Sequence, residues 1–243
     1  EDGERIPLTV AACNKKTGAV KIIFQVVGAT TEKLNHKKEG EYIQDFVGPL
    51  GKPTRTEGIK KVCIVGGGVG CAIALPVAQA FKDLGAEVTS IIGFRSKDLL
   101  ILEEEFKEAS KELVVMSDDG SYGRHGNVTV PLKEMLEAGK QFDEIITIGP
   151  LIMMKFVTLT AKPFGVPVTV SMNPIMIDGT GMCGCCRLTL VKDDKRITKF
   201  ACVDGPDFNG YEVDFDESMS RGRMYFPFER KAHEETCNLF KQA

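Results

Sequence analysis

The sequence contains no tryptophan and no long run of basic residues, and its 243 residues carry a formal net charge of −3 at pH 7. Domains that bind nucleic acids usually carry a basic patch or stripe. Neither the charge nor its distribution therefore gives a reason to expect DNA or RNA binding. The hydrophobic content of 43% is that of an ordinary globular protein, and the length allows two domains, or one domain with a small appended module.

An uninterrupted apolar stretch long enough to cross a membrane is also missing. The most apolar segment, residues 62–82, is broken by glycines between positions 66 and 70 and by Pro76, whereas a membrane-spanning helix needs about 20 consecutive apolar residues. No signal peptide is visible. We therefore expect a cytoplasmic protein without a membrane span. The chain begins at Glu1 rather than methionine, which is compatible with a preceding stretch that this sequence lacks.

The eight cysteines are unevenly distributed along the chain. Four of them are scattered singly, and those inside apolar stretches are typical of small buried hydrophobic side chains in a reducing compartment. These four are Cys13, Cys63, Cys71 and Cys237. The other four gather in the carboxy-terminal third, at Cys183, Cys185, Cys186 and Cys202.

Residues 178–202 place ligand-capable side chains at the spacing D-x4-C-x2-C-x15-C. This is the spacing of plant-type [2Fe-2S] ferredoxins, with a carboxylate in place of the first thiolate. Two alternating segments on either side of a polar turn at residues 192–195 predict a β-hairpin, which would return the last cysteine to the loop. The spacing therefore indicates an iron-sulfur cluster and electron transfer. The predicted metal ligands are Asp178, Cys183, Cys186 and Cys202.

Two other readings of this cluster of cysteines stay open. An all-thiolate site would use Cys185 in place of Asp178, but adjacent residues tend to point apart, so we favour Asp178 and treat Cys185 as a neighbour of Cys186. A structural zinc site usually has two separated C-x2-C-like pairs, and only one is present.

A strand, a glycine-rich turn and a helix are predicted over residues 60–84, followed by a strand at 87–92. The glycines at 66–70 would let a pyrophosphate approach the start of the helix. A strict G-x-G-x-x-G motif is not met, because Cys71 occupies its third glycine position. The second strand ends without an acidic residue, and the Arg95 loop after it either contacts the adenosine moiety or is solvated.

Strands and helices continue to alternate as far as residue 171, which predicts a parallel sheet with helices on both faces. Ligands of such sheets bind at the carboxyl ends of the strands. Three predicted turns fall at that edge, at residues 66–70, 119–120 and 149–150. The pattern also predicts strands at 113–116, 144–148 and 167–171 and helices at 131–139 and 151–164.

The amino-terminal part is separated from the sheet by a turn-rich connection at residues 47–56, with two prolines and two glycines. Before it, residues 20–27 predict a strand, and Gly28 leads into a helix start capped by threonine. Such a start either holds a phosphate or is simply a capped helix.

The order of these motifs resembles the ferredoxin-NADP reductase superfamily, over nearly the whole chain. Within it, the chain is most similar to the small iron-sulfur flavoprotein subunits of NADH-dependent ferredoxin:NADP oxidoreductases, also known as sulfide dehydrogenase subunits. The electron-transfer subunits of dihydroorotate dehydrogenases come next. The resemblance implies cysteine at position 178 for the second group and aspartate for the first, so Asp178 favours the first group.

The resemblance implies an α/β fold with a β-barrel in three parts. A flavin-binding β-barrel domain would span residues 1–56, a parallel-sheet NAD(P)-binding domain residues 57–171, and a small [2Fe-2S] module residues 172–243. Relatives carry further strands before Arg5, so the barrel as given is incomplete. The implied cofactors are FAD, the [2Fe-2S] cluster and NAD(H), and Arg95 leaves NADP(H) open.

The resemblance also assigns cofactor-binding residues. For FAD these are Arg5, Pro7, Leu8, Thr9, Val27, Gly28, Thr30 and Thr31. For the nicotinamide dinucleotide they are Gly66, Gly67, Gly68, Val69, Gly70, Arg95, Ser96, Asp119, Gly120, Gly149, Pro150 and Met153.

The implied activity is that of an oxidoreductase subunit. Hydride would pass between NAD(H) and FAD, and single electrons would pass through the cluster to or from a larger flavoprotein subunit in an electron-bifurcating complex. No side chain would act as an acid or base. Residues 203–210 and the basic pair Arg221 and Arg223 would contact that subunit or form solvated loops. A zinc-stabilised nucleotide-binding regulator is the alternative from another class.

Overall fold

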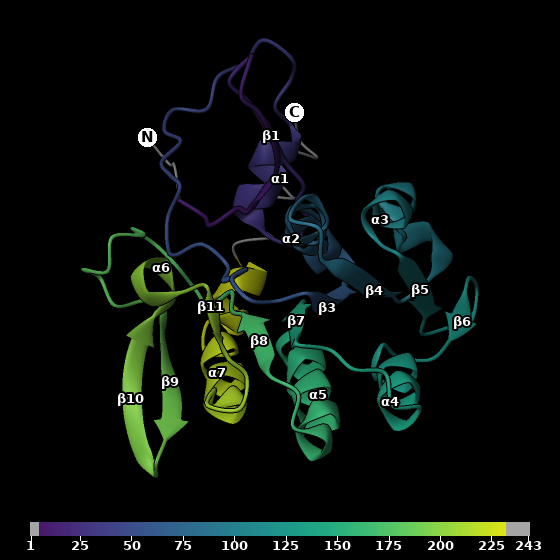
Figure 1. The fold of residues 1–243 in the computed structure, drawn as a ribbon. Coiled ribbons are helices and arrows are strands. Elements are labelled where there is room, and N and C mark those ends of the chain that lie inside the picture. The colour runs from purple at the N-terminus through teal and green to yellow at the C-terminus, as the bar shows by residue number, and fades with distance from the viewer. Residues whose placement is uncertain (1–4, 232–243) are drawn as a thin grey trace.

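A seven-stranded sheet forms the centre of the computed structural model, which describes residues 5–231 (Figure 1). The strand order is β11-β8-β7-β3-β4-β5-β6. Strands β3 to β8 are parallel to their neighbours, and β11 is antiparallel to β8. The expected parallel sheet is therefore confirmed. The bounds are β3 (Lys61–Gly67), β4 (Glu87–Phe94), β5 (Glu112–Ser117), β6 (Arg124–His125), β7 (Glu144–Ile148), β8 (Val168–Ser171) and β11 (Asp207–Asn209).

Helices cover both faces of this sheet, with α2 and α3 on one face and α4 and α5 on the other (Figure 1). Side chains along a strand alternate between the two faces. On β3, Val62 and Ile64 join the core under α2 and α3, whereas Cys63 and Val65 join the core under α4 and α5. The helices are α2 (Cys71–Asp83), α3 (Glu103–Ala109), α4 (Thr129–Glu137) and α5 (Leu151–Ala161), with short 3-10 turns η1 (Gly68–Gly70), η2 (Lys97–Leu99) and η3 (Lys162–Phe164).

The single cysteines differ in burial. Cys63 and Cys71 are fully buried, as expected of small hydrophobic side chains. Cys13 is exposed, contrary to that expectation, because it lies in a two-stranded hairpin that leaves most of its residues open to solvent. Cys237 lies outside the described residues.

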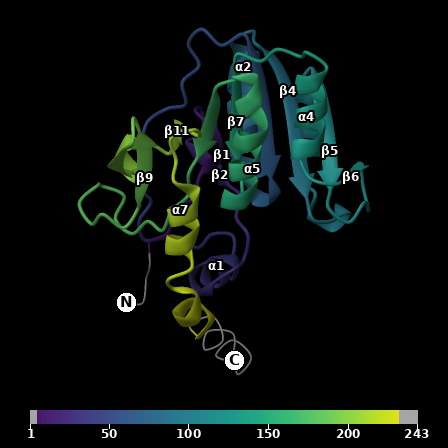
Figure 2. The same cartoon turned by 90° about the horizontal axis from the view of Figure 1, so that it is seen from below.

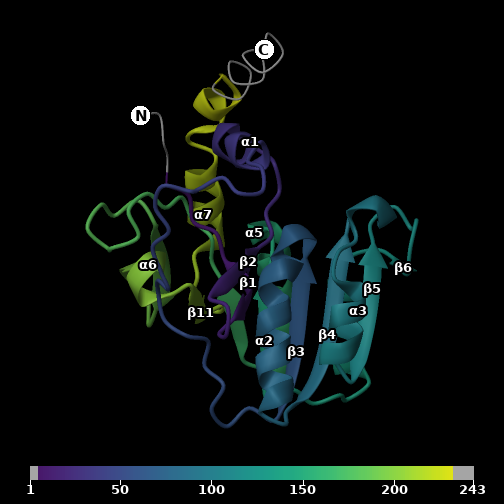
Figure 3. The ribbon, with the colours of Figure 1, turned by 90° about the horizontal axis from the view of Figure 1, so that it is seen from above.

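The amino-terminal part consists of a hairpin and a short helix, and β1 packs beside α2 (Figure 3). The strand expected over residues 20–27 is too long: β2 ends at residue 22, because β1 offers no partner beyond the end of the hairpin. Within residues 5–56 no closed barrel is seen, so the flavin-binding barrel stays a prediction. The elements are β1 (Val10–Asn14), β2 (Ala19–Ile22) and α1 (Ala29–Asn35).

The carboxy-terminal part begins with the predicted hairpin, whose turn residues Asp193 and Asp194 have φ of 49° and 59°. Left-handed conformations at both central residues are typical of a two-residue hairpin turn. Beyond the hairpin, β11 adds to the edge of the main sheet, and α7 lies between β9 and α5 (Figure 2). The elements are β9 (Arg187–Lys192), β10 (Lys195–Phe200), α6 (Ala201–Asp204) and α7 (Phe215–Gly222). None of the helices in residues 5–231 has the length and apolar character that a bilayer crossing requires.

Candidate functional site

The predicted metal ligands lie on a loop that connects β8 to β9, here called the cluster loop (residues 172–186), and at the end of the hairpin that follows it. Asp178 closes the first turn of the cluster loop. Its Oδ1 accepts a hydrogen bond from the backbone N–H of Thr180 (2.6 Å) and its Oδ2 accepts one from that of Cys183 (3.0 Å). These donors, that of Thr180 first, hold the pKa of Asp178 below its usual range, so the carboxylate is an anionic oxygen donor at neutral pH.

Two glycines give the cluster loop its shape. Gly179 and Gly181 have φ of +79° and +86°, a region that side chains rarely adopt. A Cβ at Gly179 would also come within 2.5 Å of Leu50, and one at Gly181 within 3.1 Å of Val203. The cluster loop is therefore packed tightly against both the connection to the amino-terminal part and the residue after Cys202.

The hairpin brings two predicted ligands together. The Sγ atoms of Cys186 and Cys202 lie 3.2 Å apart, and both residues are buried. This separation is far longer than a disulfide bond of about 2.05 Å. It is close to the roughly 3.7 Å between two sulfurs that share a tetrahedral metal ion at about 2.3 Å. Burial raises the pKa of the Cys202 thiol to about 11. A bound cation would favour the thiolate instead, so metal binding would release a proton.

The remaining two cysteines form a second pair nearer the surface. Cys183 is exposed and Cys185 is half-buried. A hydrogen bond between their thiols raises the pKa of Cys185. Cys186 contacts Cys202, whereas it is Cys183 that affects the pKa of Cys185, as expected if adjacent side chains point apart.

The four predicted ligands comprise the Cys186–Cys202 pair and, on the cluster loop, Cys183 with Asp178, whose Oδ2 accepts from the N–H of Cys183. Within residues 5–231, no three His, Cys, Asp or Glu side chains are grouped as one metal ion would require. A two-iron cluster is held at two metal positions by four donors, and thiolates are its usual ligands. Three thiols and one carboxylate, on one glycine-shaped loop and the end of a hairpin, have the chemistry that a [2Fe-2S] cluster needs. The assignment of individual ligands stays a prediction.

The predicted nicotinamide-binding turns lie at the carboxyl edge of the sheet. The turn after β3 meets the turn after β7, since a Cβ added at Gly67 would overlap the thioether of Met153 and approach Pro150. At Gly70 a Cβ would lie 2.6 Å from the carbonyl oxygen of Ile148. The glycines thus permit close packing of these turns, and at Gly68, whose Cβ would meet nothing within 4 Å, the turn is open.

The loops after β4 and β5 also contact each other. The backbone N–H of Asp119 donates to the carbonyl oxygen of Arg95 (3.2 Å), and that of Lys97 donates to the hydroxyl of Ser121 (2.8 Å). Arg95, Asp119 and Gly120 are exposed, and Ser96 is half-buried. The structure therefore brings the Arg95 loop and the turn at Asp119 and Gly120, both predicted to bind the dinucleotide, into one largely exposed group.

The predicted flavin-binding residues lie on both sides of the β1–β2 hairpin in sequence. The expected threonine cap is wrong, because α1 already begins at Ala29 with Gly28 as its N-cap. Thr31 lies in the first turn instead, and its Oγ1 accepts from the N–H groups of Val27 (3.0 Å) and Gly28 (3.1 Å). Arg5 forms an exposed ion pair with Asp45 at 3.6 Å. Their role in FAD binding stays a prediction. The other residues of this group are Pro7, Leu8, Thr9 and Thr30.

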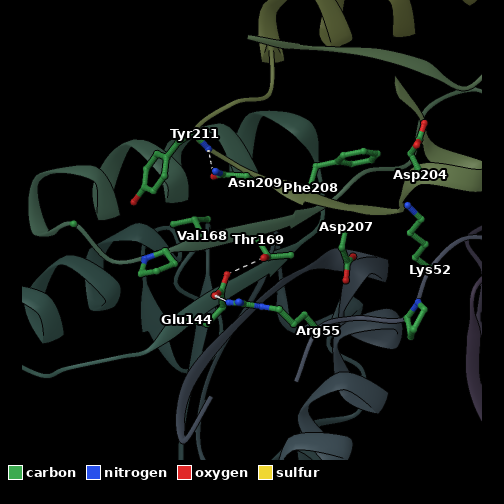
Figure 4. Close-up of a pocket in the computed structure, with 13 residues that line it drawn as sticks. Lys52, Arg55, Glu144, Val168, Thr169, Asp204, Asp207, Phe208, Asn209 and Tyr211 are labelled. Carbon is green, nitrogen blue, oxygen red and sulfur yellow. Dashed lines mark hydrogen bonds and ion pairs between the residues drawn. The ribbon is translucent and has the colours of Figure 1, made fainter. Parts of the chain in front are cut away.

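A cavity of about 530 Å³ lies at the opposite edge of the sheet, at the amino ends of β7 and β8 (Figure 4). Buried Glu144 is held there by Arg55 (3.1 Å) and Thr169 (2.7 Å) (Figure 4). Asp207 accepts a hydrogen bond from Thr54 (2.6 Å). This cavity was not predicted from the sequence, although a charged residue, Glu144, begins the apolar strand 144–148 beside it.

A second cavity, of about 480 Å³, lies beside β5 and is lined by Glu103 and Tyr122. Neither cavity is lined by a residue of the predicted cofactor or metal sites.

Comparisons with known proteins agree with this arrangement. Residues 173–214 match the iron-sulfur cluster binding domain of dihydroorotate dehydrogenase B. A dihydroorotate dehydrogenase B (NAD(+)), electron transfer subunit homolog of Thermotoga maritima is 50% identical over 234 residues, which cover 96% of this chain and 81% of that protein. A probable electron transfer subunit of the same enzyme from Methanocaldococcus jannaschii is 40% identical over 189 residues, covering 78% and 70%.

A solved structure shows the same likeness. A chain from the structure of an NADH-dependent reduced ferredoxin-NADP oxidoreductase, described for its insights into flavin-based electron bifurcation, is 47% identical. The match covers 97% of this chain and 83% of that chain, with a TM-score of 0.89.

The parallel sheet and the thiol-rich cluster loop, together with these likenesses, define an electron-transfer subunit of an oxidoreductase. The chain belongs to the family of dihydroorotate dehydrogenase B electron-transfer subunits and their homologues. The resemblance found in the sequence is thereby confirmed.

Proposed function

We propose that this chain passes electrons between NAD(H), FAD and a [2Fe-2S] cluster, to or from a larger flavoprotein subunit, in an electron-bifurcating NADH-dependent ferredoxin:NADP oxidoreductase. One observation carries the proposal. Nearly the whole chain, 97%, aligns at 47% identity with a chain from a solved protein of that activity. The thiols of Cys183, Cys186 and Cys202 and the carboxylate of Asp178 support it, because they supply the four donors that the cluster needs.

Each part of the chain has its own task in this proposal. A bound flavin would accept two electrons as hydride and release them singly. We assign its binding to residues 1–56, NAD(H) to residues 57–171 and the cluster to residues 172–243. The open turn at Gly68 and the start of α2 would receive the dinucleotide phosphates, because the first N–H groups of a helix attract anions.

The cluster loop would orient the ligands of the cluster. No side chain would have to donate or accept a proton during electron transfer. Asp178 shapes the first turn through its two backbone hydrogen bonds, and the hairpin sets the separation of Cys186 and Cys202. The larger subunit would receive the electrons. Its involvement is supported by the relatives, which are named electron transfer subunits of a larger enzyme.

A second candidate is the electron-transfer subunit of a dihydroorotate dehydrogenase. The match of residues 173–214 to the cluster-binding domain of that enzyme favours it, as do the names of the relatives. Asp178 favours the bifurcating enzyme. The two candidates would differ in the large subunit that co-purifies with the chain from its native source.

Anaerobic purification of the intact protein tests the proposal. We expect a brown protein that contains iron, inorganic sulfide and flavin, and that gives a low-temperature EPR signal after reduction. A colourless protein with zinc and no EPR signal would instead identify a nucleotide-binding regulator and overturn the proposal.

A further inference from the structure

Two guanidinium groups hold the cluster loop between its predicted ligands. Arg221 Nη2 donates a hydrogen bond to the carbonyl oxygen of Cys185 (3.4 Å), although 36 residues separate them in sequence. The residue before Cys185 is Gly184, and Arg187 Nη1 donates to its carbonyl oxygen (3.2 Å). Two consecutive peptide groups, directly before Cys186, therefore each contact a permanent positive charge.

Arg221 reaches the cluster loop because α7 is firmly anchored. Asp214 caps the helix by accepting from the N–H of Glu217 (2.9 Å), and Arg196 pairs with both carboxylates at 3.0 and 2.6 Å. Lys155 of α5 pairs with Asp216 at 2.7 Å. These contacts fix α7 against the hairpin on one side and α5 on the other. The position of its last turn, which carries Arg221, is thus set by the fold.

Among residues 5–231, neither Arg221 nor Arg187 has a carboxylate within ion-pair distance. Arg221 is half-buried, whereas Arg187 and Arg223 are exposed. A half-buried charge is screened less by solvent and salt than an exposed one. Solvent therefore weakens the charge of Arg221 less than that of Arg187, and of Arg221 and Arg223 it is Arg221 that hydrogen-bonds to the cluster loop.

We propose that the positive charge of Arg221 raises the reduction potential of the cluster held by this loop, with Arg187 as a weaker second contributor. The inference rests on the function proposed above. Reduction adds one electron, and thus one negative charge, to a cluster whose ligands are already anionic. A nearby positive charge stabilises the reduced form more than the oxidised form. The sequence-based expectation was a partner contact or a solvated loop, and neither alternative included this contact with the cluster loop.

A redox titration tests the assignment. The intact protein and the variants Arg221→Gln, Arg221→Lys and Arg223→Gln are purified anaerobically, and their iron and sulfide contents are measured. Each is then reduced stepwise with dithionite while the EPR signal of the cluster is followed. We expect Arg221→Gln to shift the midpoint to a more negative potential and Arg221→Lys to shift it less. Arg223→Gln is the matched control and should leave it unchanged.

Three results would overturn the assignment. One is an unchanged midpoint in Arg221→Gln with a full cluster, and another is an equal shift in Arg221→Gln and Arg223→Gln. Loss of iron from both Arg221→Gln and Arg221→Lys would also overturn it, because the guanidinium would then hold the loop by shape rather than tune it by charge. A wild-type protein without iron or sulfide would instead defeat the proposed function itself.

Discussion

The sulfur atoms of Cys186 and Cys202 lie 3.2 Å apart across the base of a β-hairpin. The ladder pairs Arg187 with Phe200, and the N–H of Ala201 donates to the carbonyl oxygen of Cys186 (3.1 Å). The backbone register therefore fixes the two thiols before any metal is bound. Cys186 and Cys202 are thus preorganised by local structure, whereas the positions of Asp178 and Cys183 depend on the conformation of the cluster loop.

Replacing Cys202 by serine should remove the cluster. Loss of an outer-shell partner alone costs about 10–100-fold in metal affinity, so the loss of a buried ligand should leave little iron. Iron and sulfide analysis of anaerobically purified Cys202→Ser measures this. Cys13→Ser is the control, because Cys13 is exposed on β1 and should keep the wild-type content. A fully loaded Cys202→Ser protein would exclude Cys202 as a ligand.

Two substitutions at Asp178 should separate its roles. Asp178→Cys supplies a thiolate and should keep the cluster, with an EPR spectrum that differs from wild type because a soft donor replaces a hard one. Asp178→Ala removes the donor and the acceptor for the N–H groups of Thr180 and Cys183, so it should lower the iron content. If Asp178→Ala kept a full cluster with the wild-type spectrum, the fourth ligand of the wild-type cluster would be Cys185 and not Asp178.

A methyl group at Gly70 should destabilise the nucleotide-binding sheet. Its Cβ would lie 2.6 Å from the carbonyl oxygen of Ile148 and 2.8 Å from Cα of Gly149, both backbone atoms that cannot rotate away. Overpacking of this kind costs about 1–3 kcal/mol, and each kcal/mol lowers the melting temperature by about 2–4 °C at this chain length. Thermal unfolding of Gly70→Ala tests the expectation.

Gly222→Ala provides the matched control for that measurement. A Cβ at Gly222 meets nothing within 4 Å, and the residue ends α7 with an ordinary helical backbone. Its melting temperature should stay at or slightly above that of the wild type, since alanine favours a helix more than glycine does. Equal melting temperatures of Gly70→Ala and Gly222→Ala would contradict the prediction, because the turn after β3 would then accommodate the methyl group without loss of stability.

The half-buried carboxyl of Asp207 should make the stability depend on pH. Burial raises the pKa of Asp207 above its ordinary value of 3.8, despite the hydrogen bonds from Thr54 and Ser171. The folded chain therefore binds this proton more tightly than the unfolded chain does. The stabilisation is complete below the ordinary pKa and is lost as the pH rises through the raised one.

Asp207→Asn should remove that dependence. The amide retains the shape and can still accept from the Thr54 hydroxyl, but it carries no charge. We expect the variant to melt at a higher temperature than wild type at pH 7, with a difference that shrinks toward pH 4. Melting curves across this range are the measurement, and Asp194→Asn, at an exposed position in the hairpin turn, is the control. A variant that melts lower at pH 7 would mean that the ionised carboxylate is the stabilising form.

Much of the main sheet could be predicted from the sequence. The strands β3, β4, β7 and β8 are mostly buried and are therefore rich in apolar residues, whereas β5 is fully buried only at its carboxyl end. The hairpin that carries Cys202 was equally visible, because its alternating strands flank a polar turn. These elements could be predicted because the residues of each segment determine its secondary structure without contacts from distant parts of the chain.

The missed elements depend on distant parts of the chain. The three residues of β11 form a strand only because β8 presents an open edge, and α7 is positioned by ion pairs with Arg196 and Lys155. The cavity around Glu144 joins residues 89 positions apart in sequence, Arg55 and Glu144. Similarly, the sequence placed Arg221 in a basic tail, but only the packing of α7 brings it to the cluster loop.

The short strand β11 ties the metal-bearing part of the chain to the sheet. Its residues pair with Ser171, Val170 and Thr169, and the N–H groups of Met172 and Gly210 extend the ladder at both ends. Fraying of this edge would loosen the segment just after Cys202 at the same time. Heating should therefore remove the visible absorption of the cluster and unfold the sheet in one cooperative transition. Neither part should fold independently when it is exchanged between relatives.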